Sequence, residues 1–131
     1  MDRLPRRIFF FAAVYGIIVM LPQYFLEAQI GRDDPPPITH PEHFYGFIGV
    51  VLLWQIVFLL IARDVKRYRP LMPLAMLEKL AFGLPAIVLY AMKRSSAPVA
   101  IFGAIDLVLC VLFIIAFLTK ESQEGKQLVR Q

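Results

Sequence analysis

Four polar side chains stand within long apolar stretches of this sequence, and their types could bind a polar group or move a proton. Glu78 and Lys79 are adjacent, Gln55 lies in an earlier stretch, and Asp106 lies in a later one. An ionic group at the centre of a membrane helix costs about 2.5–3.5 kcal/mol unless it finds a partner. We therefore expect these residues to face one another or a ligand, and Lys79 is the nearest cation for Asp106.

The spacing assigns a depth and a face to each of these residues. Gln55 and Glu78 each lie about 10 Å from the inner ends of their runs by the helical rise, so they can meet at one level. Asp106 is predicted to point into a bundle, because it shares one helical face with Gly103, Cys110 and Phe113. Adjacent helical residues point about 100° apart. Glu78 and Lys79 are thus not expected to face the same neighbour, and Lys79 is expected to extend toward the cytoplasmic head groups.

Two interpretations of Gln55, Glu78, Lys79 and Asp106 stay open. A buried hydrogen-bonded cluster would fix the register of the helices, whereas a functional site would handle protons or orient a ligand. Trp54 is placed with these candidate ligand-binding residues, although an aromatic side chain in mid-span more often packs. No catalytic residue is assigned, because the sequence offers no nucleophile paired with a base.

A second candidate group is formed by His40, Glu42 and His43, at the expected external mouth of the protein. Two histidines and a carboxylate can bind a divalent metal ion. The His-x-x-His spacing in a proline-stiffened segment, however, lacks the i, i+4 geometry of a helical zinc pair. We expect solvated interfacial residues here and assign no metal. If an ion did bind, the additional carboxylates within reach in the sequence would be Glu27, Asp33 and Asp34.

The elements that must hold these residues are four apolar runs, at residues 8–26, 44–62, 71–92 and 97–119. Residues 44–62 contain no charged side chain and cover most of the roughly 30 Å hydrocarbon core. Of the 131 residues, 59% are hydrophobic and the mean hydropathy is +0.65, more than a soluble core of this size can hide. Pro85 is expected to kink the third helix. Residues 27–43 form a stiff external connection in which three prolines favour polyproline II, and residues 120–131 form a polar tail.

The basic residues orient the chain in the membrane. With four spans, one side of the bilayer would hold only Arg32, Lys93 and Arg94. The other side would hold the remaining basic residues, namely Arg3, Arg6, Arg7, Arg63, Lys66, Arg67, Arg69, Lys120, Lys126 and Arg130. The positive-inside rule then places both termini in the cytoplasm. The predicted fold class is all-α: a polytopic membrane protein, a single-domain antiparallel four-helix transmembrane bundle. Close backbone approach is available at Gly46, Gly49, Gly83 and Gly103.

Several short segments between residues 40 and 80 carry a resemblance to a known group. The segments, in order, are HPEHFYGF, WQ, IARD, RYRPLM and LEK. They resemble the DoxX-like small four-helix membrane proteins of bacteria. The resemblance implies a four-helix bundle in the bacterial inner (cytoplasmic) membrane and supplies no catalytic assignment. For some relatives in the wider group, the resemblance also suggests an association with quinol-linked redox or thiol stress systems. Thiol chemistry would need paired cysteines, however, and this chain has only Cys110.

Two classes of function follow. The first is a non-catalytic membrane protein that binds a hydrophobic or amphiphilic ligand, such as a lipid or quinone-like molecule, or serves as an accessory subunit of a membrane complex or homo-oligomer. The second is a quinone-linked or proton-coupled enzyme or carrier that uses Glu78 and Asp106. The bilayer is the expected partner and nucleic acid is not, because the basic residues flank apolar runs instead of forming a stripe. The identity of any cofactor is not predicted.

Overall fold

A computed structural model describes the backbone of residues 3–130 and the side chains of residues 3–119 and 128–130. Every regular element in this part of the chain is a helix, in the order α1 (Arg3–Met20), η1 (Leu21–Phe25), α2 (Glu27–Asp33), α3 (Pro41–Arg63), η2 (Arg69–Leu71), α4 (Met72–Ala91) and α5 (Ala97–Arg130). Four segments are long and apolar enough to cross a membrane, namely Arg3–Phe25, Pro41–Arg63, Arg69–Ala91 and Ala97–Thr119. The predicted all-α class with four spanning helices is confirmed.

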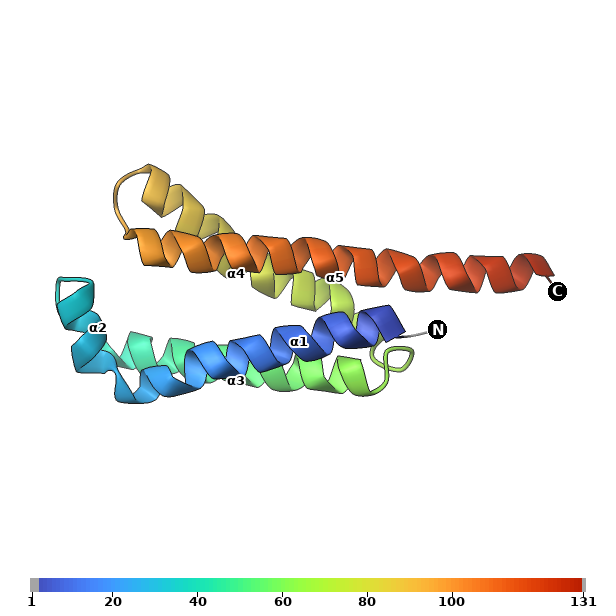
Figure 1. Ribbon diagram of the computed structural model, residues 1–131, viewed down its shortest axis with the longest axis horizontal. Coiled ribbons are helices and arrows are strands. Elements are labelled where there is room, and N and C mark those ends of the chain that lie inside the picture. The colour runs from blue at the N-terminus through green and yellow to red at the C-terminus, as the bar shows by residue number, and fades with distance from the viewer. Residues whose placement is uncertain (1–2, 131) are drawn as a thin grey trace.

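The four long helices form two antiparallel pairs. Helix α1 packs along α3, and α4 packs along α5, while α1 also touches α5. Helices α3 and α4 contact each other much less. Figure 1 shows the two chain ends at one end of the bundle and α2 at the opposite end. The two pairs are therefore joined mainly through α1 and α5.

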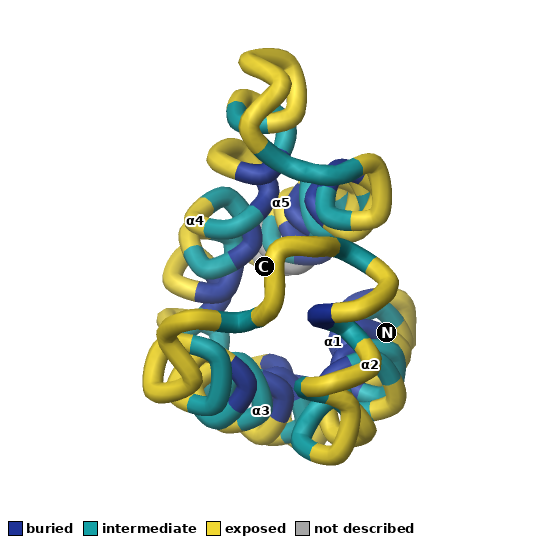
Figure 2. Tube along the Cα trace, turned by 90° about the vertical axis from the view of Figure 1, so that its left-hand side faces the viewer, coloured by how far each residue is buried: buried dark blue, intermediate teal, exposed yellow. Residues whose placement is uncertain are grey.

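An aromatic core, formed by Phe9, Phe58 and Phe113, lies where α1, α3 and α5 meet. All three side chains are fully buried. The Phe9 and Phe113 rings stack at 4.2 Å between centroids, and Phe58 meets Phe113 edge-on at 5.1 Å. Figure 2 shows buried positions facing the middle of the molecule and exposed positions facing outward. Because many exposed positions carry large apolar side chains, the outer surface is suited to lipid.

Helices α4 and α5 approach each other closely at two glycines, Gly83 and Gly103. A Cβ atom built on Gly103 would lie 2.6 Å from the Ala86 Cβ, and one built on Gly83 would lie 3.0 Å from the Gly103 carbonyl oxygen. Small residues allow this approach, which brings the two backbones together as they cross (Figure 1). Gly46, by contrast, has no neighbouring atom within 4 Å of its built Cβ. Helix α4 continues through Pro85.

The structure differs from the sequence-based expectation in the connection after α1, and it adds a helical backbone to the segment expected as a polar tail. The connection at residues 27–43 contains the short helix α2, which has Glu27 in its first turn and Arg32 in its last, as the helix dipole favours. The chain leaves the helix at Asp34, directly before the prolines. Helix α5 extends to Arg130, so the segment expected as a polar tail is helical to that residue. The side chains of residues 120–127, and residue 131, lie outside the described part of the chain.

Candidate functional site

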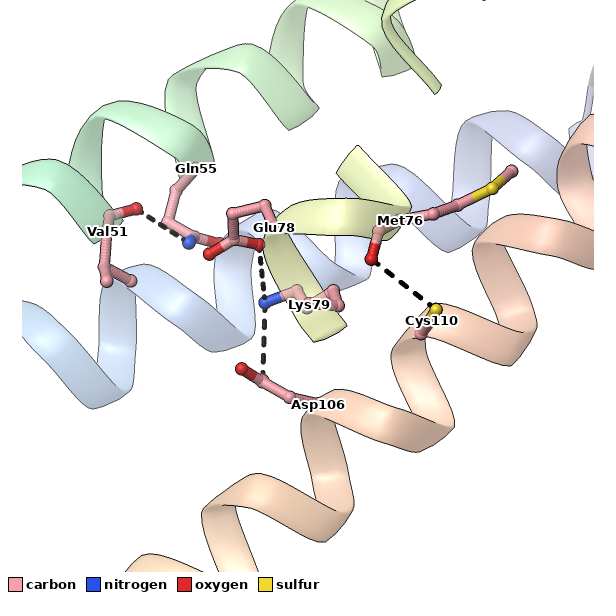
Figure 3. Close-up of polar contacts among 7 residues, drawn as sticks. All are labelled: Val51, Gln55, Met76, Glu78, Lys79, Asp106 and Cys110. Carbon is pink, nitrogen blue, oxygen red and sulfur yellow. Dashed lines mark hydrogen bonds and ion pairs between the residues drawn. The ribbon is translucent and has the colours of Figure 1, made fainter. Parts of the chain in front are cut away.

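Lys79 lies buried between two carboxylates and is the centre of the candidate site. Its side chain is 3% exposed, and its Nζ atom lies 3.4 Å from Asp106 Oδ1 and 3.6 Å from Glu78 Oε2. Figure 3 shows the ammonium group between the two carboxylates. The expectation that Lys79 extends to the head groups is wrong. The four-carbon stem is long enough to bring Nζ back beside Glu78, although the two Cα–Cβ bonds diverge.

The close crossing of α4 and α5 explains the pairing of Lys79 with Asp106. Lys79 lies about one turn before Gly83, and Asp106 lies about one turn after Gly103. In antiparallel helices, a residue before the crossing on one helix lies beside a residue after the crossing on the other. The two glycines thus set the backbone distance at which the lysine can reach the carboxylate. As expected from its helical face, Asp106 points into the bundle.

The Lys79 ammonium also contacts the aromatic core. Its Nζ atom lies 5.2 Å from the centroid of the Phe58 ring, within the range of a cation–π interaction. The ammonium group thereby joins the ionic site to the packed phenylalanines beside it. With both carboxylates ionised, two negative charges face one positive charge, which leaves a formal charge of −1 in a largely buried place. Such an excess favours a further hydrogen-bond donor or a proton.

Gln55 of α3 adds an amide to this group and completes what we call the polar cluster: Gln55, Glu78, Lys79 and Asp106. The amide is fully buried, and its Nε2 donates to the Val51 carbonyl at 2.8 Å. Within the described residues, Gln55 Oε1 and Glu78 Oε2 are buried without a hydrogen-bond partner. The 3.6 Å contact of Glu78 Oε2 with Lys79 is an ion pair and too long for a hydrogen bond. In Figure 3 the Gln55 and Glu78 side chains extend toward one another.

Gly16 of α1 supports the cluster and was not singled out from the sequence. A Cβ atom built on Gly16 would overlap Gln55 Oε1, so the amide rests directly on the bare backbone of α1. The signal was present as Ala12-x-x-x-Gly16, a small-residue pair that allows close helix contact. Tyr15, the preceding residue, is partly buried. All four long helices therefore contribute to this region.

Trp54 takes a packing position. Its ring lies 6.3 Å from that of Phe58 and borders the buried apolar residues near the chain ends. Cys110, one turn after Asp106, places its Sγ atom 3.6 Å from the Met76 carbonyl oxygen. Trp54 and Cys110 thus have packing roles near the polar cluster and are not part of it.

The residues expected at the external mouth form a separate group, the histidine cluster of His40, Glu42 and His43. Glu42 Oε1 lies 3.3 Å from His40 Nδ1 and 3.5 Å from His43 Nε2, and all three side chains are exposed. The other carboxylates considered from the sequence bind elsewhere: Glu27 accepts from the Tyr45 hydroxyl, Asp33 from Gln29, and Asp34 from Ser96.

A hollow of about 440 Å³ lies near the same mouth. It is lined by Glu27, Ala28, Gly31, Arg32, Pro37 and Ile38. These residues belong to α2 and to the proline-containing segment that follows it. The hollow involves none of the polar cluster, so the two features are distinct.

The fold and the buried ionic group define a class: a multi-pass helical membrane protein with polar residues inside its bundle. Within that class the comparisons give nothing narrower. Neither models of protein families, nor curated proteins, nor solved structures yield a match to this chain.

Proposed function

We propose that this chain is a non-catalytic membrane protein that binds the polar end of a hydrophobic or amphiphilic molecule at its polar cluster. The head group would donate hydrogen bonds, and the apolar remainder would lie among the surrounding helices. The observation that carries the proposal is the pair of buried acceptors, Gln55 Oε1 and Glu78 Oε2, that have no hydrogen-bond partner among the described residues. In this part of the chain Gln55 Oε1 is left unpaired, and Glu78 Oε2 is held only by its 3.6 Å ion pair with Lys79. An unpaired buried acceptor costs about 1–3 kcal/mol, so a donor supplied by a ligand would be favourable.

The helix packing supports a route from the lipid to this pair. Gln55 lies on α3 and Glu78 on α4, and these two helices contact each other far less than the pairs α1–α3 and α4–α5 do. Phe47 and Phe82 pair at 5.7 Å across the same two helices. If α3 and α4 moved apart, a flat or chain-like apolar molecule could enter between them, and little packing would be lost elsewhere.

We further propose that both termini are cytoplasmic and that the protein belongs to the bacterial inner membrane. The distribution of basic residues supports this orientation, because the end of the bundle that carries both chain ends also carries the basic segment after α3. The likeness of residues 40–80 to DoxX-like proteins supports the same assignment. Cytoplasmic reporter activity from fusions at both ends is the expected result. Opposite locations of the two ends would refute the orientation.

Native mass spectrometry of the protein extracted with its own lipids tests the ligand proposal. We expect the wild type to carry a co-purifying small molecule and Glu78→Gln to lose most of it, because the substitution keeps the size of the side chain but removes a charged acceptor. Gln55→Leu should have the same effect. Asp33→Asn, an exposed carboxylate change near the mouth, serves as the control. Equal occupancy in all four proteins, or no bound molecule in the wild type, would refute the proposal.

The excess negative charge of the polar cluster favours one second candidate, a proton-coupled or quinone-linked role for Glu78 and Asp106. When one of the two carboxylates that share the Lys79 ammonium takes up a proton, the net charge of the group falls from −1 to zero. If this candidate holds, Glu78→Gln and Asp106→Asn abolish proton uptake that accompanies transport or quinone reduction in reconstituted vesicles. Unchanged uptake in both variants would exclude it.

A further inference from the structure

The histidine cluster has the composition and the spacing of a metal site. His40, Glu42 and His43 offer two imidazole nitrogens and a carboxylate oxygen, and these ligand atoms all lie within 4.8 Å of one another. Imidazole suits Zn²⁺, Cu²⁺ and Ni²⁺, and a carboxylate completes many such sites. The side chains of His40, Glu42 and His43 are 73%, 66% and 76% exposed, so an ion can reach them from the external solution.

The backbone holds these three residues in one rigid turn. His40 is the N-cap of α3, and Pro41 occupies the first helical position with its fixed φ. The His40 carbonyl accepts from the backbone N–H groups of His43 and Phe44 at 3.0 and 3.2 Å. The ligands are thus brought together by local backbone structure, before any ion binds, and this reduces the entropy lost on binding.

The distances agree with tetrahedral coordination. With metal–ligand distances of about 2.0–2.2 Å, two ligands of a tetrahedral Zn²⁺ ion lie about 3.3–3.6 Å apart. The two histidine–glutamate distances, 3.3 and 3.5 Å, already match this spacing. The third edge joins the two imidazole nitrogens, which lie within 4.8 Å of one another and would have to come closer when an ion binds.

We propose that His40, Glu42 and His43 bind a divalent transition-metal ion at the external mouth, with Zn²⁺ as the probe. Glu42 supplies the negative charge that offsets the positive end of the α3 dipole, and water fills the open coordination position. The sequence alone favoured solvated residues, because His-x-x-His is a poor zinc pair on a regular helix. His40, however, lies outside the helical conformation as the N-cap, so the i, i+4 requirement does not apply to it.

Titration of the full chain in detergent micelles with Zn²⁺, followed by calorimetry, tests this site. The protein must be purified with a tag that contains no histidine. We expect one ion per chain in the wild type and at least tenfold weaker binding in His40→Ala, His43→Ala and Glu42→Gln. Bound Co²⁺ should give the visible absorption that is typical of a low coordination number. This absorption should be absent in the same three variants.

Asp33→Asn is the matched control, because Asp33 is an exposed carboxylate near this mouth that bonds to Gln29 and not to the histidine cluster. Its affinity for Zn²⁺ should equal that of the wild type. Circular dichroism would show that the exposed substitutions leave the helices intact. Absence of Zn²⁺ binding in the wild type, or equal affinity in all variants, would overturn the proposal.

Discussion

The Gln55 amide of α3 occupies the space that a side chain at Gly16 of α1 would fill. A Cβ atom at Gly16 would overlap Gln55 Oε1 and would lie 2.9 Å from Gln55 Cγ. The glycine therefore allows the fully buried Gln55 amide to pack directly against the backbone of α1. The shape of the polar cluster depends on this missing methyl group as well as on the ionic residues.

Gly16→Ala should destabilise the protein by about 1–3 kcal/mol, because the added methyl group forces the buried Gln55 side chain to move. The free energy of unfolding in mixed micelles measures the effect. Gly46→Ala is the control, since its Cβ would meet no atom within 4 Å. The cost of Gly16→Ala should shrink when Gln55 is also changed to alanine. Equal costs in the two backgrounds would disprove the contact.

Lys79→Met should be strongly destabilising, by about 3–5 kcal/mol, because it leaves two largely buried carboxylates without their shared cation. Replacing all three charges, as Glu78→Gln, Lys79→Met and Asp106→Asn together, should recover most of this loss. Lys66→Met, at an exposed position, should change stability little. Unfolding in mixed micelles again measures these effects. A triple variant as unstable as Lys79→Met would contradict the assignment of the loss to unpaired charge.

Ser96→Ala should loosen the end of the bundle that carries α2. The Ser96 hydroxyl donates to Asp34 Oδ2 at 2.6 Å and so ties the α4–α5 turn to the end of α2. Loss of a hydrogen bond to a charged group should raise hydrogen exchange of the α2 amides about tenfold. Ser95→Ala is the matched control, because the Ser95 Oγ has no hydrogen-bond partner in the described part of the chain. Identical exchange in the two variants would contradict this link.

The four helices and the inward face of Asp106 could be predicted from the sequence, because apolar length and helical periodicity are local properties. Helix α2 was not predicted from the sequence. The extended conformation that the three prolines after Asp34 favour was assigned to all of residues 27–43. Its own signals, Glu27 at the start and Arg32 near the end, favour a helix.

The direction of Lys79 and the role of Gly16 could not be derived in the same way. Both depend on how neighbouring helices cross. The 100° rule describes where the bond from Cα to Cβ points, but the terminal atom of a long side chain goes to the nearest partner. Here the partner is fixed by the approach of α4 and α5 at Gly83 and Gly103. Such a crossing is a tertiary feature. The sequence shows the small residues that permit it, but it does not show where the helices cross.

The most direct test of the intramembrane site is a solid-state NMR distance between the Lys79 side-chain nitrogen and the Asp106 carboxylate in lipid bilayers. With ¹⁵Nζ-lysine and ¹³Cγ-aspartate labels, we expect dephasing from an Nζ–Cγ distance that is consistent with a direct ion pair, whose Nζ–Oδ1 distance is 3.4 Å, and loss of this dephasing in Asp106→Asn. No dephasing in the wild type, or the same dephasing in Asp106→Asn, would contradict the proposed site.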